Sequence, residues 1–135
     1  MKVLLSIKPE FANKIFDGQK RFEYRKVIFK QQKIQTVVVY ASSPVCKVIG
    51  EFDIDTILIS DPESLWQQTK SGSGITYNYF EQYFQGKEQA YAIQVKNARR
   101  YPKAYRLSEK YPGVIPPQSF CYVDRKRELE PIEML

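Results

Sequence analysis

The sequence contains no histidine among its 135 residues. This absence excludes catalysis by Ser-His-Asp and Cys-His arrangements, and it excludes zinc sites that depend on imidazole ligands. Any general base in this chain must therefore be a lysine, a glutamate, an aspartate or a tyrosine. We expect neither a metal nor a cofactor.

Cysteines and long apolar runs are also scarce. Cys46 and Cys121 lack the CxxC spacing of metal and redox sites. Both lie in apolar surroundings, "PVCKVIG" and "SFCYV", so we expect packed free thiols. No run approaches the roughly 20 residues of a membrane helix, and the opening "MKVLLSIKPE" has too short an apolar stretch for a signal peptide. We expect a soluble, cytoplasmic protein with no membrane partner.

Positive charge, by contrast, is in excess. Lysine and arginine total 21 against 15 acidic residues, which gives a net charge of +6 and a pI near 9.3. A basic surface favours polyanions such as nucleic acid or nucleotides, although a modest excess also occurs in proteins that bind neither. Charge alone therefore leaves an RNA or nucleotide-like partner open.

The hydrophobic patterns predict strands mixed with short helices. Helices are expected to begin at Pro9, at Pro62 and after Thr76, and Gly18 is expected to end the first of them. Strands are expected at residues 1–7, 21–25, 36–41, 47–59 with a bend near Gly50, 89–101 and within 116–123. Strands dominate both ends and do not alternate with long helices.

This arrangement predicts the α+β class. We expect a small mixed β-barrel of about five to six strands with two or three short helices packed around it. A chain of this length fits one domain, which we place at residues 1–123. Residues 124–135, "DRKRELEPIEML", form a charged tail that is either mobile or a docking helix. The sequence does not indicate an oligomeric state.

The stretch "GQKRFEYRK", residues 18–26, carries the strongest candidate site. Its alternation places Arg21, Glu23 and Arg25 on one strand face, with Lys20 at the turn before them. One interpretation is a solvated face with exposed ion pairs worth about 0–1 kcal/mol each. The other is a polar site in which the cations hold a phosphate and Glu23 accepts hydrogen bonds from a base or an exocyclic amine.

Two further candidates follow strands. Lys8 lies between the first strand and the first helix, where an anion is favoured, but it also fits a plain surface lysine. Ser42 and Ser43 directly follow a buried strand and suit hydrogen bonds to a ligand, but serine before proline is also common turn chemistry.

A second basic stretch, "RRYPKAYR", interleaves cations with tyrosines. Arg99, Arg100, Lys103 and Arg106 form a secondary basic patch that suits single-stranded nucleic acid, since bases stack on tyrosine rings. The alternative is an ordinary basic loop. The aromatic stripe at residues 79–84 has helical spacing, which is more often core than ligand site.

Taken in order, "LLSIKPEFANKIFDGQKRFEYRK", "VVVYASSPVCKVIGEFDI", "YAIQV" and "PPQSFCYV" resemble the ASCH family of PUA-like domains over about residues 1–123. The resemblance implies a β-barrel with a basic cleft beside the first helix. Family members are thought to bind RNA or nucleotides, often in links to translation or transcription, so we expect an RNA- or nucleotide-binding module. The residues that the resemblance places around the cleft are Lys8, Lys20, Glu23 and Arg25, with Ser42 and Ser43 at the rim and Gln118 and Ser119 opposite.

Some relatives remove the acetyl group from N4-acetylcytidine with a Gly-x-Lys-Thr-x-Thr-x-Arg motif, in which the lysine serves as base toward the second threonine. Here Arg21 and Glu23 occupy the threonine positions, so that nucleophile is missing. The alternative function is a small amidohydrolase or ribonuclease acting on N4-acylated cytidine or RNA, with Glu23 activating a water and Lys20 stabilising the oxyanion. A third is a protein–protein adaptor with an aromatic surface at residues 77–84.

Overall fold

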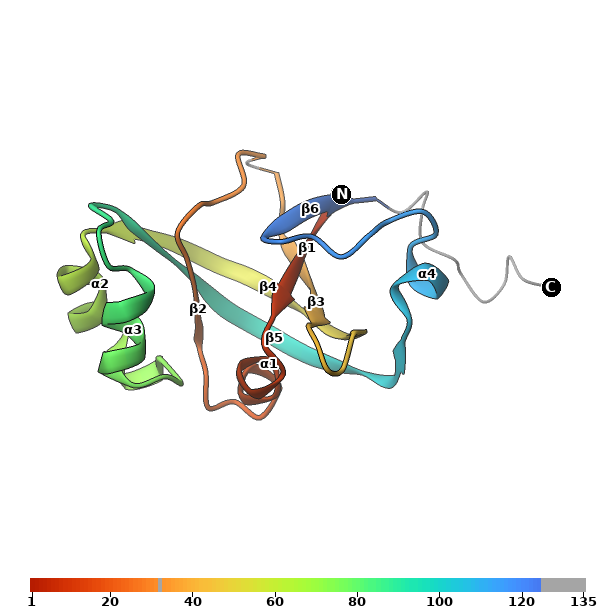
Figure 1. The fold of residues 1–135 in the computed structure, drawn as a ribbon, viewed down its shortest axis with the longest axis horizontal. Helices are drawn as coiled ribbons and strands as arrows, with labels where there is room; N and C mark the ends of the chain where they lie inside the picture. The colour runs from red at the N-terminus through yellow and green to blue at the C-terminus, as the bar shows by residue number, and fades with distance from the viewer. Residues whose placement is uncertain (32, 125–135) are drawn as a thin grey trace.

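The computed structural model describes residues 1–31 and 33–124, and it is built on one curved, mixed sheet (Figure 1). Strand β1 pairs in parallel with β3, and the other strand pairs are antiparallel. The mixed sheet agrees with the α+β class. The six strands, in the spatial order β2-β5-β4-β3-β1-β6, are Lys2–Ile7 (β1), Phe22–Arg25 (β2), Thr36–Ala41 (β3), Lys47–Ser60 (β4), Ala90–Tyr105 (β5) and Phe120–Val123 (β6).

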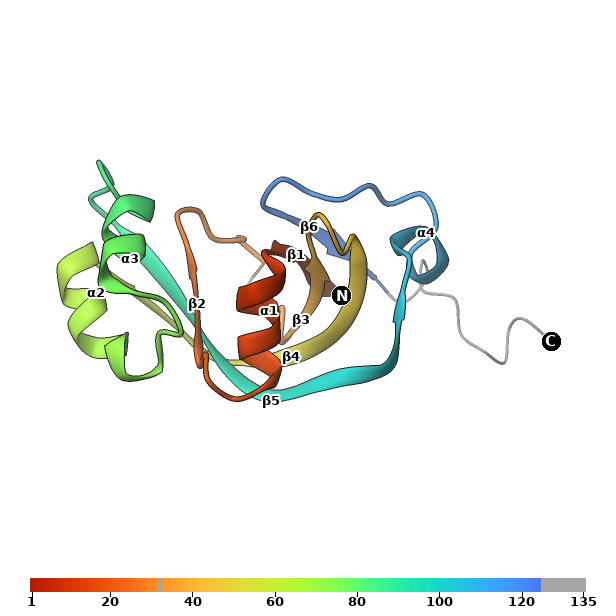
Figure 2. The same cartoon turned by 60° about the horizontal axis from the view of Figure 1, so that its bottom comes forward.

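Within the described residues, four short α-helices accompany the sheet, rather than the expected two or three. They are Pro9–Phe16 (α1), Pro62–Thr69 (α2), Tyr77–Tyr83 (α3) and Leu107–Lys110 (α4), with a 3-10 turn, Lys70–Gly72 (η1), after α2. The first three start where the sequence predicts, and Gly18 follows α1 with a φ of 82° that favours glycine. Helices α2 and α3 lie together at one end of the long β4–β5 ribbon, while α4 lies at the other end (Figures 1 and 2).

The expected β-barrel is not confirmed. The sheet curls strongly (Figure 2), but within the described residues its edge strands β2 and β6 are not paired with each other. Strand β2 is only four residues long and pairs with β5. A side chain spans the gap instead, because Arg25 of β2 donates hydrogen bonds to Ser119 at the start of β6 and to the carbonyl of Ser6 on β1.

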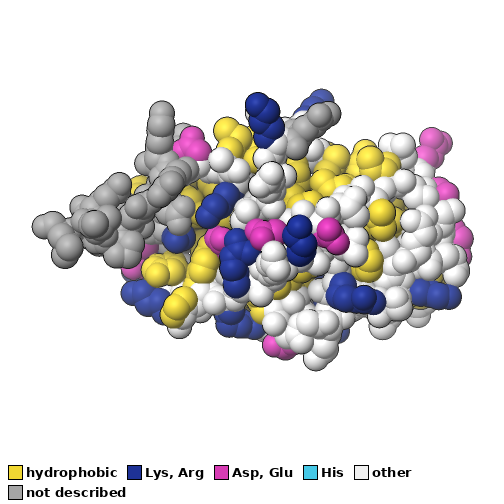
Figure 3. Space-filling view, turned by 180° about the vertical axis from the view of Figure 1, so that it is seen from behind, with side chains coloured by type: hydrophobic (Ala, Val, Ile, Leu, Met, Phe, Trp, Pro, Cys, Tyr) yellow, Lys and Arg dark blue, Asp and Glu magenta, His cyan; other side chains and the backbone are white. Residues whose placement is uncertain are grey.

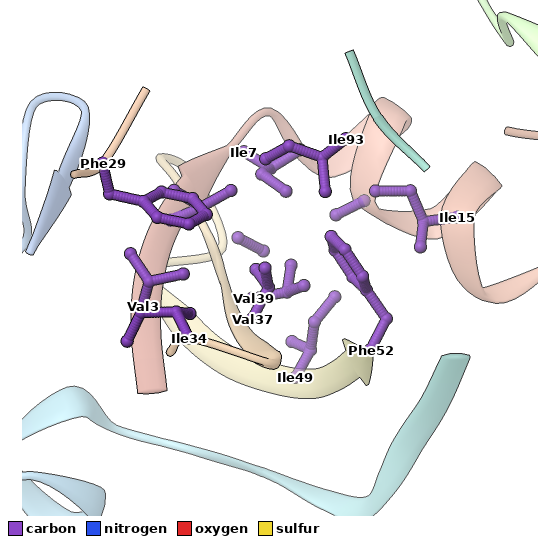
Figure 4. Close-up of a cluster of buried hydrophobic side chains, with 13 residues drawn as sticks. Val3, Ile7, Ile15, Phe29, Ile34, Val37, Val39, Ile49, Phe52 and Ile93 are labelled. Atoms are coloured by element: carbon purple, nitrogen blue, oxygen red, sulfur yellow. The ribbon is translucent and has the colours of Figure 1, made fainter. Parts of the chain in front are cut away.

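The main core lies inside the curl of the sheet, with α1 against it. Figure 4 shows Val3, Ile15, Val39 and Phe52 directed toward one another from β1, α1, β3 and β4. A second cluster packs under α2 and α3, and a third joins α4 to the other side of the sheet. These clusters hold β2, α1 and α3 in fixed positions around the site described below.

Residues 125–135, nearly all of the expected charged tail, lie outside the described residues. In residues 1–31 and 33–124, no helix has the length and apolar character that a bilayer crossing requires.

Gly50 allows α1 to pack on the sheet. The predicted bend near Gly50 appears as a register shift between Val48 and Gly50 in a single long β4 strand. A Cβ atom at Gly50 would lie 2.6 Å from the carbonyl oxygen of Arg99 and 2.6 Å from a ring carbon of Phe16, the last residue of α1. Only glycine fits this close approach without a shift of the backbone.

We therefore expect Gly50→Ala to lower the free energy of unfolding by about 1–3 kcal/mol, because the added methyl group overpacks the contact between α1 and the sheet. Urea unfolding monitored by circular dichroism measures this loss. Asp55→Ala, on an exposed position of the same strand, is the matched control and should change stability by less than about 0.5 kcal/mol. Equal unfolding midpoints for the two variants would contradict the packing role.

Candidate functional site

Five separated segments enclose a cavity of about 580 Å³, a size typical of small-ligand sites. They are the β1–α1 junction, the segment leading into β2 together with β2, the end of β3 with its following turn, the region of α3, and the turn before β6. The lining residues are Ser6, Ile7, Lys8, Phe11, Lys20, Glu23, Tyr24, Arg25, Tyr40, Ser42, Ser43, Cys46, Ile75, Tyr79, Tyr83, Pro116, Pro117 and Gln118.

The structure brings together most of the residues that the sequence singles out. Seven of the eight expected at the cleft line this cavity: Lys8, Lys20, Glu23, Arg25, Ser42, Ser43 and Gln118. The eighth, Ser119, contacts Arg25 through its carbonyl and its hydroxyl oxygen, both of which accept from Nη2 at 2.9 and 3.0 Å.

The interpretation of β2 as a solvated charged face is wrong. Glu23 and Arg25 are only 6% and 8% exposed, and Lys20 is 2% exposed. Arg21 departs from the expected shared face, since it is exposed and its Nη2 donates to Ser71 Oγ at 3.3 Å. The physical reason is that β2 begins at Phe22, so the strand alternation does not extend back to Arg21.

Arg25 is held by protein groups on both of its terminal nitrogens. Nη1 donates to Glu23 Oε2 at 3.2 Å and to the Ser6 carbonyl at 3.4 Å, and Nη2 donates to Ser119. The guanidinium therefore orients Glu23 and fixes the segment before β6. This geometry differs from the expected one, in which Arg25 offers its donors to a phosphate.

Lys20 is the most deeply buried charged group of the site. Its Nζ donates to the Ser73 carbonyl at 2.7 Å and lies over the rings of Tyr24 and Phe11, 4.7 and 5.5 Å from their centroids. Burial lowers the pKa of Lys20 to about 8, with Glu23 opposing this shift and Lys14 adding to it. A lysine that titrates close to neutral pH in a cavity is typical of functional sites.

Aromatic rings form the walls of the cavity. Tyr79 and Tyr83, one turn apart on α3, line it, and Tyr79 meets Phe11 of α1 edge-on with 5.1 Å between ring centroids. Phe80 and Phe84 point to the core and are 1% and 2% exposed. The stripe expected to be core is thus core on one side and cavity on the other. Tyr77 of the same segment is 38% exposed, so the adaptor hypothesis stays a prediction.

Tyr24 and Tyr40 are buried residues of the cavity lining that the sequence patterns did not single out. Burial raises the pKa of Tyr24 to about 12, and its hydroxyl lies 2.7 Å from Thr69 Oγ1. Because Thr69 itself donates to the Leu65 carbonyl, Tyr24 is the donor in this pair. Both tyrosines occupy strand positions whose sequence pattern is typical of core residues. No local pattern therefore predicts that they line the cavity.

Cys46 also lines the cavity without having been predicted there. Burial, followed by a hydrogen bond to Cys46, raises the pKa of Tyr40. The expectation of a packed thiol is wrong for Cys46, which is exposed at a φ of 53° in the turn after β3. The turn that begins at Ser42 was the available signal, because it directs its residues toward the cavity.

The secondary basic patch lies away from the cavity. Arg99, Arg100 and Lys103 belong to strand β5 rather than to a loop, and Arg106 precedes α4. Arg99 pairs with Glu51 at 2.6 Å and with Asp53 at 3.1 Å, both on β4. Figure 3 shows such cationic and acidic side chains next to one another on the back of the molecule. Pairing with acids reduces the positive field that the patch would otherwise present.

The chemistry available in the cavity is hydrogen bonding, stacking and proton transfer. No group of three or more cysteine, aspartate or glutamate side chains that could hold a metal ion is present in the described part of the chain. Besides Arg25, the titratable groups that line the cavity are Lys8, Lys20, Glu23, Cys46 and four tyrosines.

The lowered pKa predicts how Lys20 affects stability. Unfolding restores the ordinary pKa of 10.5, so between about pH 8 and 10.5 the unfolded chain binds more protons at Lys20 than the folded chain does. The contribution of Lys20 to the free energy of unfolding therefore rises with pH across this window. Below about pH 8 the buried charge opposes folding in full.

We expect the stability difference between wild type and Lys20→Met to shift toward wild type by about 2 kcal/mol from pH 7 to pH 10. Urea unfolding of both proteins at the two pH values measures it, and titrations shared by both proteins cancel. Lys87→Met, at an exposed lysine, is the control and should show no such change. A pH-independent difference for Lys20→Met would show that Lys20 keeps an ordinary pKa.

Comparison with known proteins shows the family of the chain. The first relatives, large ribosomal subunit protein uL22 from two strains of Ureaplasma parvum, are 32% identical over 90% of this chain, but the chain spans only 39% of their length. An ASCH domain-containing ribonuclease from Zymomonas mobilis is 29% identical and is covered over 91% of its length. The crystal structure of ASCH from Zymomonas mobilis superposes with a TM-score of 0.86 at 26% identity, covering 93% of this chain and 90% of that chain. The ASCH domain family model matches residues 5–104, and the chain belongs to the ASCH domain family.

Proposed function

We propose that this ASCH domain binds single-stranded RNA by taking one nucleotide into the cavity. The observation that carries the proposal is the composition of the cavity, in which Phe11, Tyr79 and Tyr83 form aromatic walls around a charged floor. Proteins recognise single-stranded RNA by stacking splayed-out bases on aromatic rings and by hydrogen-bonding their edges. The name of the Zymomonas mobilis relative, a ribonuclease, supports RNA as the ligand class.

The mouth of the cavity suits a phosphate. Lys8, Ser43 and Gln118 line the cavity and are exposed, so they contact a ligand where it meets solvent. Lys8 also directly precedes α1, and the positive end of a helix favours an anion. Phosphate contacts supply affinity without sequence preference.

We expect a nine-nucleotide single-stranded RNA to bind with an affinity that falls as salt rises, by about 0.7 in log–log slope for each phosphate contact. Lys8→Ala should weaken binding and reduce the slope by about 0.7, because it removes one such contact. Fluorescence anisotropy across a salt series measures both quantities. Lys87→Ala, which removes an exposed lysine that does not line the cavity, is the control. Salt-independent affinity, or no binding at low salt, would reject the proposal.

A second candidate function is cleavage of the bound strand, and the relative named as a ribonuclease favours it. RNA carries its own nucleophile: the 2′-oxygen bonds to phosphorus as its proton passes to a base, and the 5′-oxygen leaves and gains a proton. The tyrosines, Lys20 and Glu23 are the groups available for such transfers. N4-acylated cytidine is a weaker candidate substrate, because Glu23 replaces the hydroxyl nucleophile and is engaged by Arg25.

For cleavage, we expect wild type to cut labelled single-stranded RNA and both Lys20→Met and Glu23→Gln to cut it at least about tenfold more slowly, since each loses a charged group that holds the nucleotide. N4-acetylcytidine should stay intact in all samples. Gel electrophoresis of the RNA and chromatography of the nucleoside provide the readouts. Equal RNA cleavage by the three preparations would mean that the activity does not belong to this cavity.

A further inference from the structure

Exposure within the cavity separates a floor from a mouth. Lys20, Glu23, Tyr24 and Arg25 are all less than a tenth exposed and form the floor. Lys8, Ser43 and Gln118 are exposed and form the mouth. A nucleotide in this cavity must therefore place one of its ends, base or phosphate, against the floor.

The floor does not suit a phosphate. Glu23 lies there with a side chain only 8% exposed, so a second anion would meet it in a weakly screened environment. The two cations of the floor compensate only in part, because Arg25 donates to Glu23, Ser6 and Ser119 and one of the three N–H groups of Lys20 donates to Ser73. The aromatic walls match a base, since every base has a face that stacks on such rings.

Glu23 presents a fixed hydrogen-bond acceptor to that base. The ion pair with Arg25, 3.2 Å from Nη1 to Oε2, orients the carboxylate. An ionised carboxylate only accepts hydrogen bonds. Lys20, whose charge interacts with that of Glu23, supplies N–H donors beside it. The floor thus combines a donor with an acceptor that has two oxygens.

We propose that the nucleotide enters base first and that Glu23 selects guanine by accepting hydrogen bonds from its N1–H and its exocyclic N2 amine. This inference rests on the proposed RNA binding. Guanine has two adjacent donors next to the O6 acceptor, which matches Glu23 beside Lys20. Uracil has a single N–H between two carbonyl oxygens, and adenine and cytosine each place an acceptor next to their amine. A buried acceptor left without its partner lowers affinity, so the mismatched bases bind more weakly.

The test uses five nine-nucleotide RNAs, each made of uridines with guanosine, inosine, adenosine, cytidine or uridine at the centre. Fluorescence anisotropy measures the affinity of the protein for each RNA at one salt concentration. Inosine is guanosine without the N2 amine, so the pair isolates one hydrogen bond to the carboxylate. We expect guanosine to bind roughly tenfold or more tightly than inosine, the range of a hydrogen bond to a charged group, and uridine to bind more weakly than inosine.

Two variants separate the floor from the mouth. Glu23→Gln should reduce the guanosine–inosine ratio to within about threefold, because an amide offers a single oxygen acceptor. Lys8→Ala should weaken the binding of all five RNAs by a similar factor and leave the guanosine–inosine ratio unchanged.

If wild type binds all five RNAs equally, the base-first orientation is overturned while RNA binding stands. If none of the five binds, the proposed function itself fails. Should Glu23→Gln not fold, the five wild-type affinities decide the question alone.

Discussion

The arrangement of the site depends on the guanidinium of Arg25. One side chain contacts Glu23 on its own strand, Ser6 on β1 and Ser119 before β6, and so connects the two unpaired edges of the curled sheet. Ser6 adds to this connection by donating from Oγ to the Pro117 carbonyl at 2.7 Å. Removing ions from water opposes folding, so a buried pair of this kind is weak evidence of stability. Its evident effect is geometric, because it fixes the acid on the floor and the segment that forms one wall.

Local sequence patterns predicted the helices and strands better than they predicted whether the sheet closes into a barrel. Proline at a helix start, a capping side chain such as Thr76 and glycine at a helix end act within a few residues, so these boundaries could be predicted. Whether the sheet closes could not be predicted from such local patterns, because strand pairing depends on contacts between distant residues. The alternation in β2 was also predicted, but not the burial of both of its faces, which results from α2 and α3 packing on one side and the cavity lying on the other.

The residues of the site likewise divide into those that the sequence predicted and those that it missed. Residues 8, 20, 23 and 25 were found because they form the pattern that resembles the ASCH family, and Ser42 and Ser43 because they end a strand. The aromatic walls were missed, since Tyr79 and Tyr83 share a helical stripe with Phe80 and Phe84 and only the packing of α3 decides which pair faces the cavity. The basic stretch at residues 99–106 shows another limit of local patterns. The acidic partners of Arg99, Glu51 and Asp53, lie almost 50 positions earlier in the chain, beyond the reach of any local pattern.

Burial of the Lys20 ammonium group at the floor opposes folding. An apolar side chain of similar volume at position 20 would fill the same space without this cost, which supports the proposed ligand site. Glu23 extends this argument, because the motif resemblance described in the sequence analysis aligns it with a threonine nucleophile. A carboxylate held by an arginine is a fixed acceptor rather than a hydroxyl nucleophile. This difference supports the proposed recognition of a base in the cavity over the removal of an acetyl group from it.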